Sequence, residues 1–310
     1  MAASRWERLA LRAAGSETAS IPVFLYGTAW KKDGTSDLVY RALCNGFKGV
    51  DTAAQPKHYR EDLVGDGIRR ALSEGKVQRE DIYIQTKYTS VGGQDPDNMP
   101  YNPSASIREQ VHTSIKSSLR NLRPSDDLDS ENNAYLDALV LHSPLPTMEQ
   151  TLEAWKACEE YVPDKIRHLG ISNCPLPVLT TLHQTVKVKP AVVQNRFYRG
   201  TCFDAGLRRF CRENSIIYQS FWTLTANPEV VYSAPVGELA NRVGSTPQAA
   251  MYCFVLGLGN TVVLNGTKNE GRMVADLQAL KKAEQFSMKH PEVWGQLQMR
   301  FNELIGEGGE

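Results

Sequence analysis

Short apolar runs rich in β-branched and aromatic residues recur along the chain, separated by longer segments of mixed polarity. Runs of roughly four to eight such residues are typical of strands that are buried on both faces. We predict eight strands, in the stretches PVFLYGT (22–28), GVDTA (49–53), IYIQTK (82–87), LDALVLH (136–142), IRHLGISN (166–173), AVVQN (191–195), IIYQSF (216–221) and TVVLNGT (261–267).

The segments between these runs have the periodicity of amphipathic helices. One series of apolar residues consists of Ile107, Val111, Ile115, Leu119 and Leu122. Its intervals of four, four, four and three residues place these side chains on one face of a helix. The same one-sided pattern recurs within 63–72, 152–158 and 273–280. The chain therefore alternates strand and helix.

Local signals mark several helix ends. Thr147 with Gln150 three residues later resembles a capping box at a helix start. Thr246 precedes a proline suited to the first helical position, and Gly75 stands where a helix C-terminal cap is expected. These signals agree with the boundaries that the apolar periodicity predicts.

Eight strands that alternate with helices indicate a parallel sheet that closes into a (β/α)8 barrel. We expect one domain over residues 1–310, with a hairpin cap in 1–20, a polar surface insertion at 125–133 and a C-terminal tail, 285–310, that packs as a helix against the barrel. The alternative is an open doubly wound sheet. Such a sheet usually has the motif G-x-G-x-x-G after its first strand, and LYGTAWKKDG (25–34) lacks it.

Composition narrows the range of partners. The 35 basic and 35 acidic side chains give a formal net charge of zero, so nothing draws the chain to nucleic acid or an anionic membrane over a long range. We expect a small-molecule partner and a monomer or weak dimer. The six cysteines show neither CxxC nor zinc-like spacing, which predicts reduced thiols and no metal site. The charged N-terminus is unlike a secretory signal, and no apolar run reaches ~18 residues, so we expect a cytoplasmic protein.

Polar residues at the ends of the predicted strands are the first candidates for a site. In a (β/α)8 barrel the loops after the strands converge on one open face, where catalytic residues lie. The candidates are Asp51, Lys87, His142, Ser172, Asn173, Gln194, Ser220 and Thr267. Each alone has an ordinary structural explanation, such as a helix cap or a turn. Aspartate, lysine and histidine at the ends of three successive strands together favour a functional site.

These residue types suit proton transfer. A tyrosine hydroxyl has an unperturbed pKa of about 10, and a nearby ammonium group lowers the pKa by stabilising the phenolate. Lys87 can supply that charge, Asp51 can hold Lys87, and His142 can orient a carbonyl oxygen that receives the proton. Tyr59, on the loop that Asp51 opens, is the nearest available hydroxyl.

The chain resembles the aldo-keto reductases. The blocks GVDTA with HYREDLVG, IYIQTKY, ALVLHSP, IRHLGISN, AVVQN and VVLNGT followed by an arginine are similar to the ordered signature blocks of that family, from about residue 22 to 285. The resemblance implies a (β/α)8 barrel that reduces aldehydes and ketones with a nicotinamide dinucleotide, usually NADPH, and needs no metal. It implies Asp51, Tyr59, Lys87 and His142 as the catalytic tetrad, with Tyr59 as general acid.

The resemblance also assigns binding residues. In the family, a serine, an asparagine and a glutamine hold the nicotinamide, which here are Ser172, Asn173 and Gln194. The full set of implied cofactor residues is Gly27, Thr28, Ala29, Asp51, Ser172, Asn173, Gln194, Ser220, Trp222, Gly266, Thr267 and Arg272. The implied substrate residues are Trp30, His58, Tyr88 and Trp222, and Tyr101, Phe197, Tyr198 and Phe221 are further candidates for an apolar pocket.

Two departures concern the catalytic loop and the nicotinamide ring. The family's tyrosine follows its aspartate by five residues, whereas Tyr59 follows Asp51 by eight, so AQPKH includes an insertion. The QPKHYRE variant resembles a branch common among fungal reductases, some of which act on secondary metabolites. The family's aromatic ring that stacks on nicotinamide is replaced by Gln219, and either Trp222 supplies a ring or none is present. Tyr218 is expected to point into the core.

A third departure concerns the adenosine phosphate. Where the family often has lysine and serine, this chain has Gly266 and Thr267, with Lys268 next to them and Arg272 at the place of the family's phosphate-contacting arginine. We expect NADPH (NADP+) to be favoured over NADH.

Three functions follow as hypotheses. The first is a carbonyl reductase with Tyr59 as proton donor. The second is a cofactor-binding regulatory barrel with little turnover, since the family includes channel-associated subunits. The third is a redox-neutral isomerase of a specialised metabolite, which the unusual QPKHY loop motivates. Consumption of NADPH with a carbonyl compound separates the first from the other two.

Overall fold

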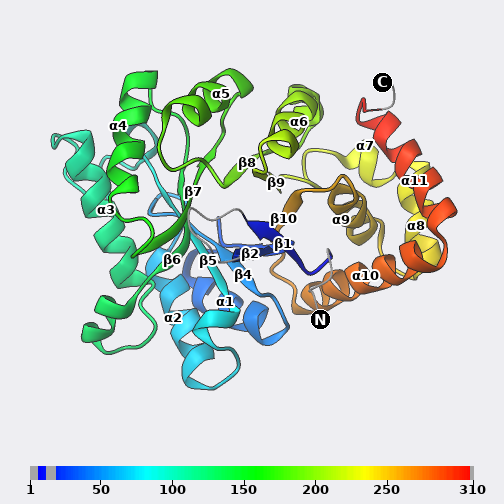
Figure 1. Cartoon of the computed structure of the whole chain (residues 1–310). Helices are drawn as coiled ribbons and strands as arrows, with labels where there is room; N and C mark the ends of the chain where they lie inside the picture. Colours follow the sequence, from blue (N-terminus) through cyan, green and yellow to red (C-terminus); the bar gives the residue numbers. More distant parts are fainter. Residues whose placement is uncertain (1–5, 12–18, 308–310) are drawn as a thin grey trace.

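Eight parallel strands form a closed barrel at the centre of the molecule (Figure 1). The structure is a computed structural model, and it describes residues 6–11 and 19–307. The strands in barrel order after β10 (Thr261–Asn265) are β3 (Phe24–Gly27), β4 (Gly49–Asp51), β5 (Tyr83–Tyr88), β6 (Leu136–Leu141), β7 (Ile166–Ser172), β8 (Val192–Arg196) and β9 (Ile217–Phe221). All eight predicted strands are confirmed, and the (β/α)8 barrel with them. The assignment of the whole chain to one domain stays a prediction.

Helices surround the barrel and connect its strands. After β3 to β8 come α1 (Thr35–Cys44), α2 (Glu61–Ser73), α3 (Ile107–Asn121), α4 (Met148–Glu159), α5 (Leu176–Thr185) and α6 (Ala205–Glu213). After β9 come α7 (Pro228–Val231), α8 (Ala234–Val243) and α9 (Pro247–Gly257), and after β10 come α10 (Glu270–Lys289) and α11 (Pro291–Leu304). Short 3-10 turns are η1 (Lys32–Gly34), η2 (Arg79–Asp81), η3 (Val91–Gly93), η4 (Leu128–Asn133) and η5 (Arg199–Asp204).

The predicted helix ends agree with the structure. The Thr147 side chain accepts a hydrogen bond from the Gln150 amide, and Thr246 caps α9 in the same way just before a proline. Gly75 lies beyond α2 with a φ of +65°, a conformation that glycine adopts without a steric cost. The predicted polar insertion at 125–133 contains η4, whose Leu128 is exposed.

An antiparallel hairpin closes the N-terminal end of the barrel. It pairs β1 (Arg8–Leu11) with β2 (Ala19–Pro22), and residues 1–5 and 12–18 of the predicted cap lie outside the described residues. Leu11 and Ile21 pack with Leu25 and Tyr83 of the barrel interior. This apolar plug leaves the C-terminal ends of the strands as the open face.

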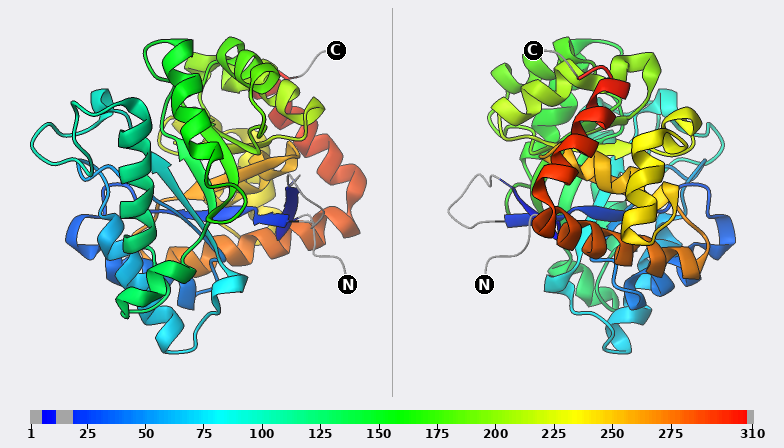
Figure 2. Two further views of the ribbon diagram at one scale, coloured as in Figure 1. Left: turned by 60° about the vertical axis from the view of Figure 1, so that its left-hand side comes forward. Right: turned by 90° about the vertical axis from the view of Figure 1, so that its right-hand side faces the viewer.

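The C-terminal helices cover one side of the barrel. Figure 2 shows α10 (orange) running along that side, with α11 (red) beside α8 (yellow). Phe301 of α11 stacks on Phe254 of α9 with ring centroids 4.9 Å apart, and both rings are buried. The predicted packing of the tail as a helix is thereby confirmed. Across the described residues, none of the helices combines the length and apolar character needed to span a bilayer.

Strand alternation determines which side chains reach the barrel interior. Neighbouring residues of a strand point to opposite faces. On β5, Tyr83, Gln85 and Lys87 point inward, while Ile84 and Tyr88 pack in the layer between barrel and helices. Polar groups inside this barrel must therefore satisfy one another or face the open end.

Candidate active site

A buried ion pair lies at the open end of the barrel. The Lys87 ammonium on β5 donates to both Asp51 oxygens on β4 at 2.7 and 2.6 Å, and to the Thr52 carbonyl at 2.8 Å. Lys87 is 1% exposed and Asp51 2%. Burial lowers the pKa of Lys87, and the Asp51 charge opposes that shift. The pair holds a lysine ammonium at one defined position.

Tyr59 and His142 complete this group. The Lys87 nitrogen lies 5.4 Å from the centroid of the Tyr59 ring, and the Tyr59 and His142 rings meet edge to face at 5.9 Å. The structure thus brings all four predicted catalytic residues together, from β4, the loop after it, β5 and the end of β6. As a whole residue, Tyr59 is partly exposed.

The loop with the predicted insertion positions Tyr59. The amides of His58 and Tyr59 both donate to the Gln55 carbonyl, at 3.1 and 3.0 Å, which folds the segment into a turn. Immediately beyond, Glu61 begins α2 and its buried carboxylate accepts hydrogen bonds from Ser118 and Asn121 of α3, both at 3.0 Å. The longer loop therefore returns Tyr59 to the barrel mouth.

Burial and the Asp51 carboxylate raise the pKa of Tyr59 above its ordinary value. The prediction that the pKa of Tyr59 is lowered is therefore wrong. The reason is that burial disfavours the charged phenolate and the Asp51 charge adds to this effect, and together they outweigh the stabilisation that the Lys87 ammonium gives. Tyr59 therefore keeps its proton at neutral pH.

His142 is a neutral imidazole. Burial lowers its pKa to about 3, with smaller contributions from Lys87 and His58. Its Nδ1 lies 2.7 Å from the Thr89 hydroxyl, which fixes the ring. If the Thr89 hydroxyl donates this bond, the proton of the imidazole is on Nε2, and that N–H can be donated to a ligand.

Three buried glutamines surround the Asp51 carboxylate inside the barrel. Gln85 and Gln194 both donate to Asp51 Oδ1, at 2.7 and 2.9 Å, and both also donate to Gln219 Oε1 at 2.8 Å. Gln219 in turn donates to Gln85 Oε1 at 2.8 Å. This closed network fixes the position of the Asp51 carboxylate from the interior of the barrel.

The sequence analysis missed Gln85 and considered Gln219 only as a lost aromatic ring. The sequence does contain a signal for both residues. Gln85 and Gln219 are polar residues within apolar strands, two residues before Lys87 and two before Phe221. Because β5 and β9 are not neighbours in the barrel, their meeting across the interior follows from closure and not from the order of the strands.

Side chains at the ends of β7 and β8 present hydrogen-bond acceptors. The Asn173 amide nitrogen donates to the His142 carbonyl at 2.9 Å, and the Ser172 hydroxyl donates to the Gln194 carbonyl at 2.7 Å. The Gln194 amide nitrogen is likewise used within the barrel. The Asn173 and Gln194 side-chain oxygens accept no hydrogen bond from the described residues, so both remain available to a ligand with N–H groups.

A cationic region lies over β3 and β10. The buried Lys31 ammonium donates to the Gly266 carbonyl, and burial, helped by the nearby Lys268 charge, lowers the pKa of Lys31 to about 8. Lys268 and Arg272 are exposed, and Thr267 is partly buried. Sequence analysis missed Lys31, although the tract WKK directly after the predicted first strand was a signal for it.

The remaining residues predicted on β3 lie at this rim. Gly27 pairs with Asp51 across the barrel ladder, and the Thr28 amide and hydroxyl both donate to the Asp51 carbonyl, at 3.0 and 2.9 Å. The Thr28 side chain is therefore occupied, and Ala29 is partly exposed. These residues fix the relative position of β3 and β4.

Two predicted contacts require correction because of strand alternation. Tyr88 follows the inward Lys87 and so points outward, where it is 1% exposed and donates to Gln110 of α3 at 3.2 Å. Ser220 likewise follows the inward Gln219, and its buried hydroxyl pairs with Thr223. Neither side chain reaches the open face. Tyr101 and Phe197 also belong to the buried core, as does Tyr218, which was expected there.

Two exposed tryptophans flank the open face. Trp30 is 58% exposed after β3 and Trp222 is 52% exposed after β9, and both have a positive φ, of 62° and 57°. The Trp30 ring lies on His58 at 3.9 Å between centroids, and its amide donates to the His58 carbonyl at 2.8 Å. Non-glycine residues in this conformation are uncommon and cluster at functional sites.

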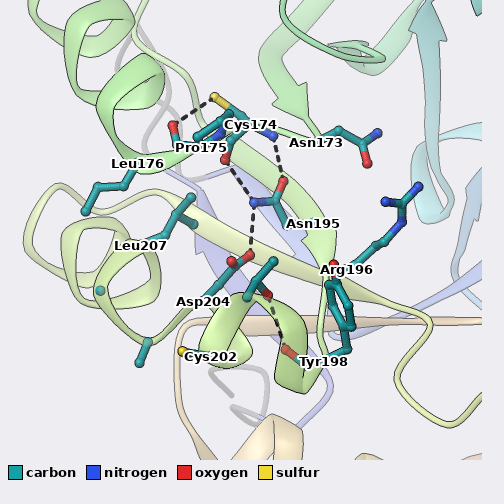
Figure 3. Close-up of a pocket in the computed structure, with 13 residues that line it drawn as sticks. Asn173, Cys174, Pro175, Leu176, Asn195, Arg196, Tyr198, Cys202, Asp204 and Leu207 are labelled. Carbon is teal, nitrogen blue, oxygen red and sulfur yellow. Dashed lines mark hydrogen bonds between the residues drawn. The ribbon is translucent and has the colours of Figure 1, made fainter. Parts of the chain in front are cut away.

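Two cavities lie next to this face. One, of about 460 Å³, is lined by the segments after β7 and β8, including Asn173, Arg196 and Asp204 (Figure 3). The other, of about 440 Å³, includes Tyr59 and Glu61 in its wall. Of the residues predicted for the site, Asn173 and Tyr198 line the first cavity and Tyr59 lines the second, whereas Lys87 and His142 line neither.

The sequence model of the Aldo/keto reductase family matches residues 25–228, which is more than half of the chain. The chain belongs to the aldo/keto reductase family. The match runs from β3 to the start of α7 and so includes all four residues of the buried group.

Curated relatives of this chain carry the names of oxidoreductases. It is 29% identical over 192 residues to an NAD(P)H-dependent D-xylose reductase of Scheffersomyces stipitis, covering 53% of each chain. The chain thus spans about half the length of that relative. It is 28% identical over 226 residues to a glycerol 2-dehydrogenase (NADP(+)) of Hypocrea jecorina, covering 68% of this chain and 67% of that one.

Solved structures of aldo-keto reductases share the fold of this chain. An enzyme from a deep-sea metagenome library of the Medee basin superposes with a TM-score of 0.71 at 20% identity, covering 95% of both chains. An aldo-keto reductase of Bombyx mori in complex with NADP superposes with a TM-score of 0.69 at 20% identity, covering 90% of this chain and 92% of that one.

Proposed function

We propose that the protein is an NADPH-dependent carbonyl reductase in which Tyr59 donates the proton to the carbonyl oxygen. The observation that carries the proposal is the group of Asp51, Lys87, Tyr59 and His142 at the barrel mouth, with a protonated phenol beside a fixed ammonium and a neutral imidazole. Membership of the family and the names of its relatives support the same reaction class.

The residues present fit a nicotinamide dinucleotide. The free oxygens of Asn173 and Gln194 suit the N–H groups of a carboxamide, and Lys31, Lys268 and Arg272 suit its phosphates. When bound, the reduced nicotinamide supplies the hydride. We assign the carboxamide to the ends of β7 and β8 and the phosphates to β3 and β10.

Each catalytic side chain then has a separate task. Tyr59 carries the proton, because its pKa is raised, and gives it to the oxygen as negative charge develops there. His142 donates its N–H to the same oxygen and orients it. Lys87 stabilises the phenolate that remains on Tyr59, and Asp51 with its glutamine network keeps Lys87 in place. Tyr59 recovers a proton from the solvent through the cavity that it lines.

A direct test combines binding and turnover with one preparation. NADPH and NADH fluorescence titrations give both cofactor affinities, and a panel of aldehydes and ketones is then followed by NADPH absorbance. We expect tight NADPH binding and oxidation with at least one class of carbonyl compound. Stoichiometric binding without oxidation across the panel would favour a regulatory barrel, and product without cofactor consumption would favour an isomerase.

Removing the exposed cations Lys268 and Arg272, just before and within the first turn of α10, should weaken NADPH binding more than NADH binding. We expect Lys268→Ala and Arg272→Ala each to raise the Kd for NADPH about tenfold, since a charge-assisted hydrogen bond is worth about 1.5–3 kcal/mol in favourable cases and less when exposed. The Kd for NADH should change by less than about twofold. An equal loss of affinity for NADPH and NADH would show that these cations do not bind the adenosine 2′-phosphate.

Cofactor affinity should depend on the ionisation of Lys31. Because the Lys31 pKa is lowered to about 8, its ammonium is present at pH 7 and is lost as the pH rises through 8. The Kd for NADPH should therefore be flat below pH 7 and rise by up to about tenfold between pH 7 and 9. Lys31→Met should weaken binding at pH 7 and remove this rise. A pH profile that is the same in both proteins would place the phosphates elsewhere.

A further inference from the structure

Arg196 ends β8 at the open face and is held there by aromatic rings. Its guanidinium lies 4.6 Å from the centroid of the Trp222 ring and 5.9 Å from that of Phe221. In Figure 3 the side chain extends toward Asn173 and away from Asn195 and Asp204, which form the other side of the cavity. An arginine stacked in this way stays at a defined place although it is exposed.

Among the described residues, none accepts a hydrogen bond from the Arg196 guanidinium. A cation–π contact with a ring uses none of the N–H hydrogen bonds of the guanidinium, and its N–H fork matches a carboxylate in bidentate geometry. Within the described residues, Arg196 makes no ion pair with a carboxylate, whereas Arg41, Arg60, Arg69 and Arg79 each do. An unused fork at the rim is a candidate receptor for an anion.

The surroundings leave the positive charge of Arg196 uncompensated. Lys87 is neutralised by Asp51, and His142 is uncharged because of its lowered pKa. Asp204, the carboxylate that shares the cavity wall, instead accepts hydrogen bonds from Asn195 at 2.9 Å and Tyr218 at 3.1 Å. Arg196 also lies apart from the phosphate cations of β3 and β10, with β9 between them in the barrel.

We propose that Arg196 binds a carboxylate of the substrate, so that the preferred substrates are aldehydes or ketones that carry an acidic group. This rests on the proposed reductase function. β8 lies two strands from β6, where His142 holds the carbonyl, which at ~4.8 Å per strand is roughly 10 Å. A rigid spacer of the size of a benzene ring suits that separation, and the exposed Trp222 ring can pack on it.

The test compares two aldehydes of nearly the same shape. They are 4-carboxybenzaldehyde and its neutral methyl ester, methyl 4-formylbenzoate, reduced at saturating NADPH. We expect the wild type to prefer the acid, and Arg196→Gln to lower the ratio of the two kcat/KM values at least tenfold through the KM of the acid. For Arg196→Lys this ratio should lie between those of the wild type and Arg196→Gln, because lysine keeps the positive charge and lacks the N–H fork.

Arg199→Gln is the matched control, since Arg199 is also exposed three residues later and does not line the cavity. It should leave the ratio as in the wild type. An Arg196→Gln protein with an unchanged ratio would overturn the proposal. If the same variant also raises the Kd for NADPH tenfold while the ratio stays unchanged, the proposal is overturned and Arg196 binds a phosphate of the cofactor instead.

A binding measurement separates this inference from the reductase proposal. Calorimetry with 4-(hydroxymethyl)benzoate and its methyl ester, titrated into the complex with NADP+, requires no turnover. Preference for the acid that is lost in Arg196→Gln supports the carboxylate site even if neither aldehyde is reduced, in which case the reductase function alone fails. Equal affinity of acid and ester in the wild type contradicts the site.

Discussion

Replacing Tyr59 by phenylalanine should lower kcat for carbonyl reduction by about 10³-fold, the typical size of a general-acid contribution. The change removes one oxygen from a ring that otherwise keeps its contacts with His142 and Lys87. The Kd for NADPH should stay within about twofold of the wild type, since the predicted binding groups lie on other strands. Stopped-flow NADPH oxidation and fluorescence titration measure the two quantities.

Tyr135→Phe is the matched control for this substitution. Tyr135 is also partly exposed, but it lies before β6 at the closed end of the barrel, stacked on Arg79 and Arg167 at 3.7 and 4.1 Å. Its removal should leave turnover unchanged. Retained turnover in Tyr59→Phe would mean that another group donates the proton, and His58, next to it in the loop, would be the first to examine.

Replacing Lys87 by methionine should both abolish turnover and destabilise the fold. The change leaves the Asp51 carboxylate buried without its cation, which costs about 3–5 kcal/mol in comparable buried pairs. The hydrogen bond to Thr52 is lost with it. Urea unfolding followed by circular dichroism gives the stability, and NADPH oxidation gives the activity.

The double variant Lys87→Met with Asp51→Asn separates the two effects. An uncharged asparagine removes the isolated buried charge, so stability should recover by more than half of the loss. Activity should not recover, because no ammonium remains to stabilise the Tyr59 phenolate. If the single variant Lys87→Met unfolds at the same urea concentration as the wild type, the ion pair is not desolvated as the structure indicates.

The barrel could be predicted from sequence because each of its strands is a short apolar run followed by an amphipathic helix. The same regularity located Asp51, Lys87 and His142, since each ends a run with a polar residue. The wrong predictions concern residues whose position within a strand decides which face of the barrel wall they lie on. A shift of one residue sends a side chain to the other face of a strand, so Tyr88 and Ser220 belong to the helix-facing layer and not to the site.

Other features depend on distances that no sequence pattern contains. The glutamine network needs β5, β8 and β9 to meet around Asp51 inside a closed barrel. The pKa of Tyr59 is raised mainly by burial and also by the Asp51 charge, and both effects depend on how the loop seats the phenol in the barrel mouth. The contact between Trp222 and Arg196 depends on the turn after β9.

The central claim is that the barrel transfers a hydride to a carbonyl carbon and a proton to its oxygen. The most direct measurement uses NADPH with deuterium at both C4 positions of the nicotinamide and an aldehyde that the wild type consumes. We predict one alcohol formed per NADPH oxidised, with one deuterium on the carbinol carbon by mass spectrometry. Product without deuterium, or product formed while NADPH stays intact, would contradict the account.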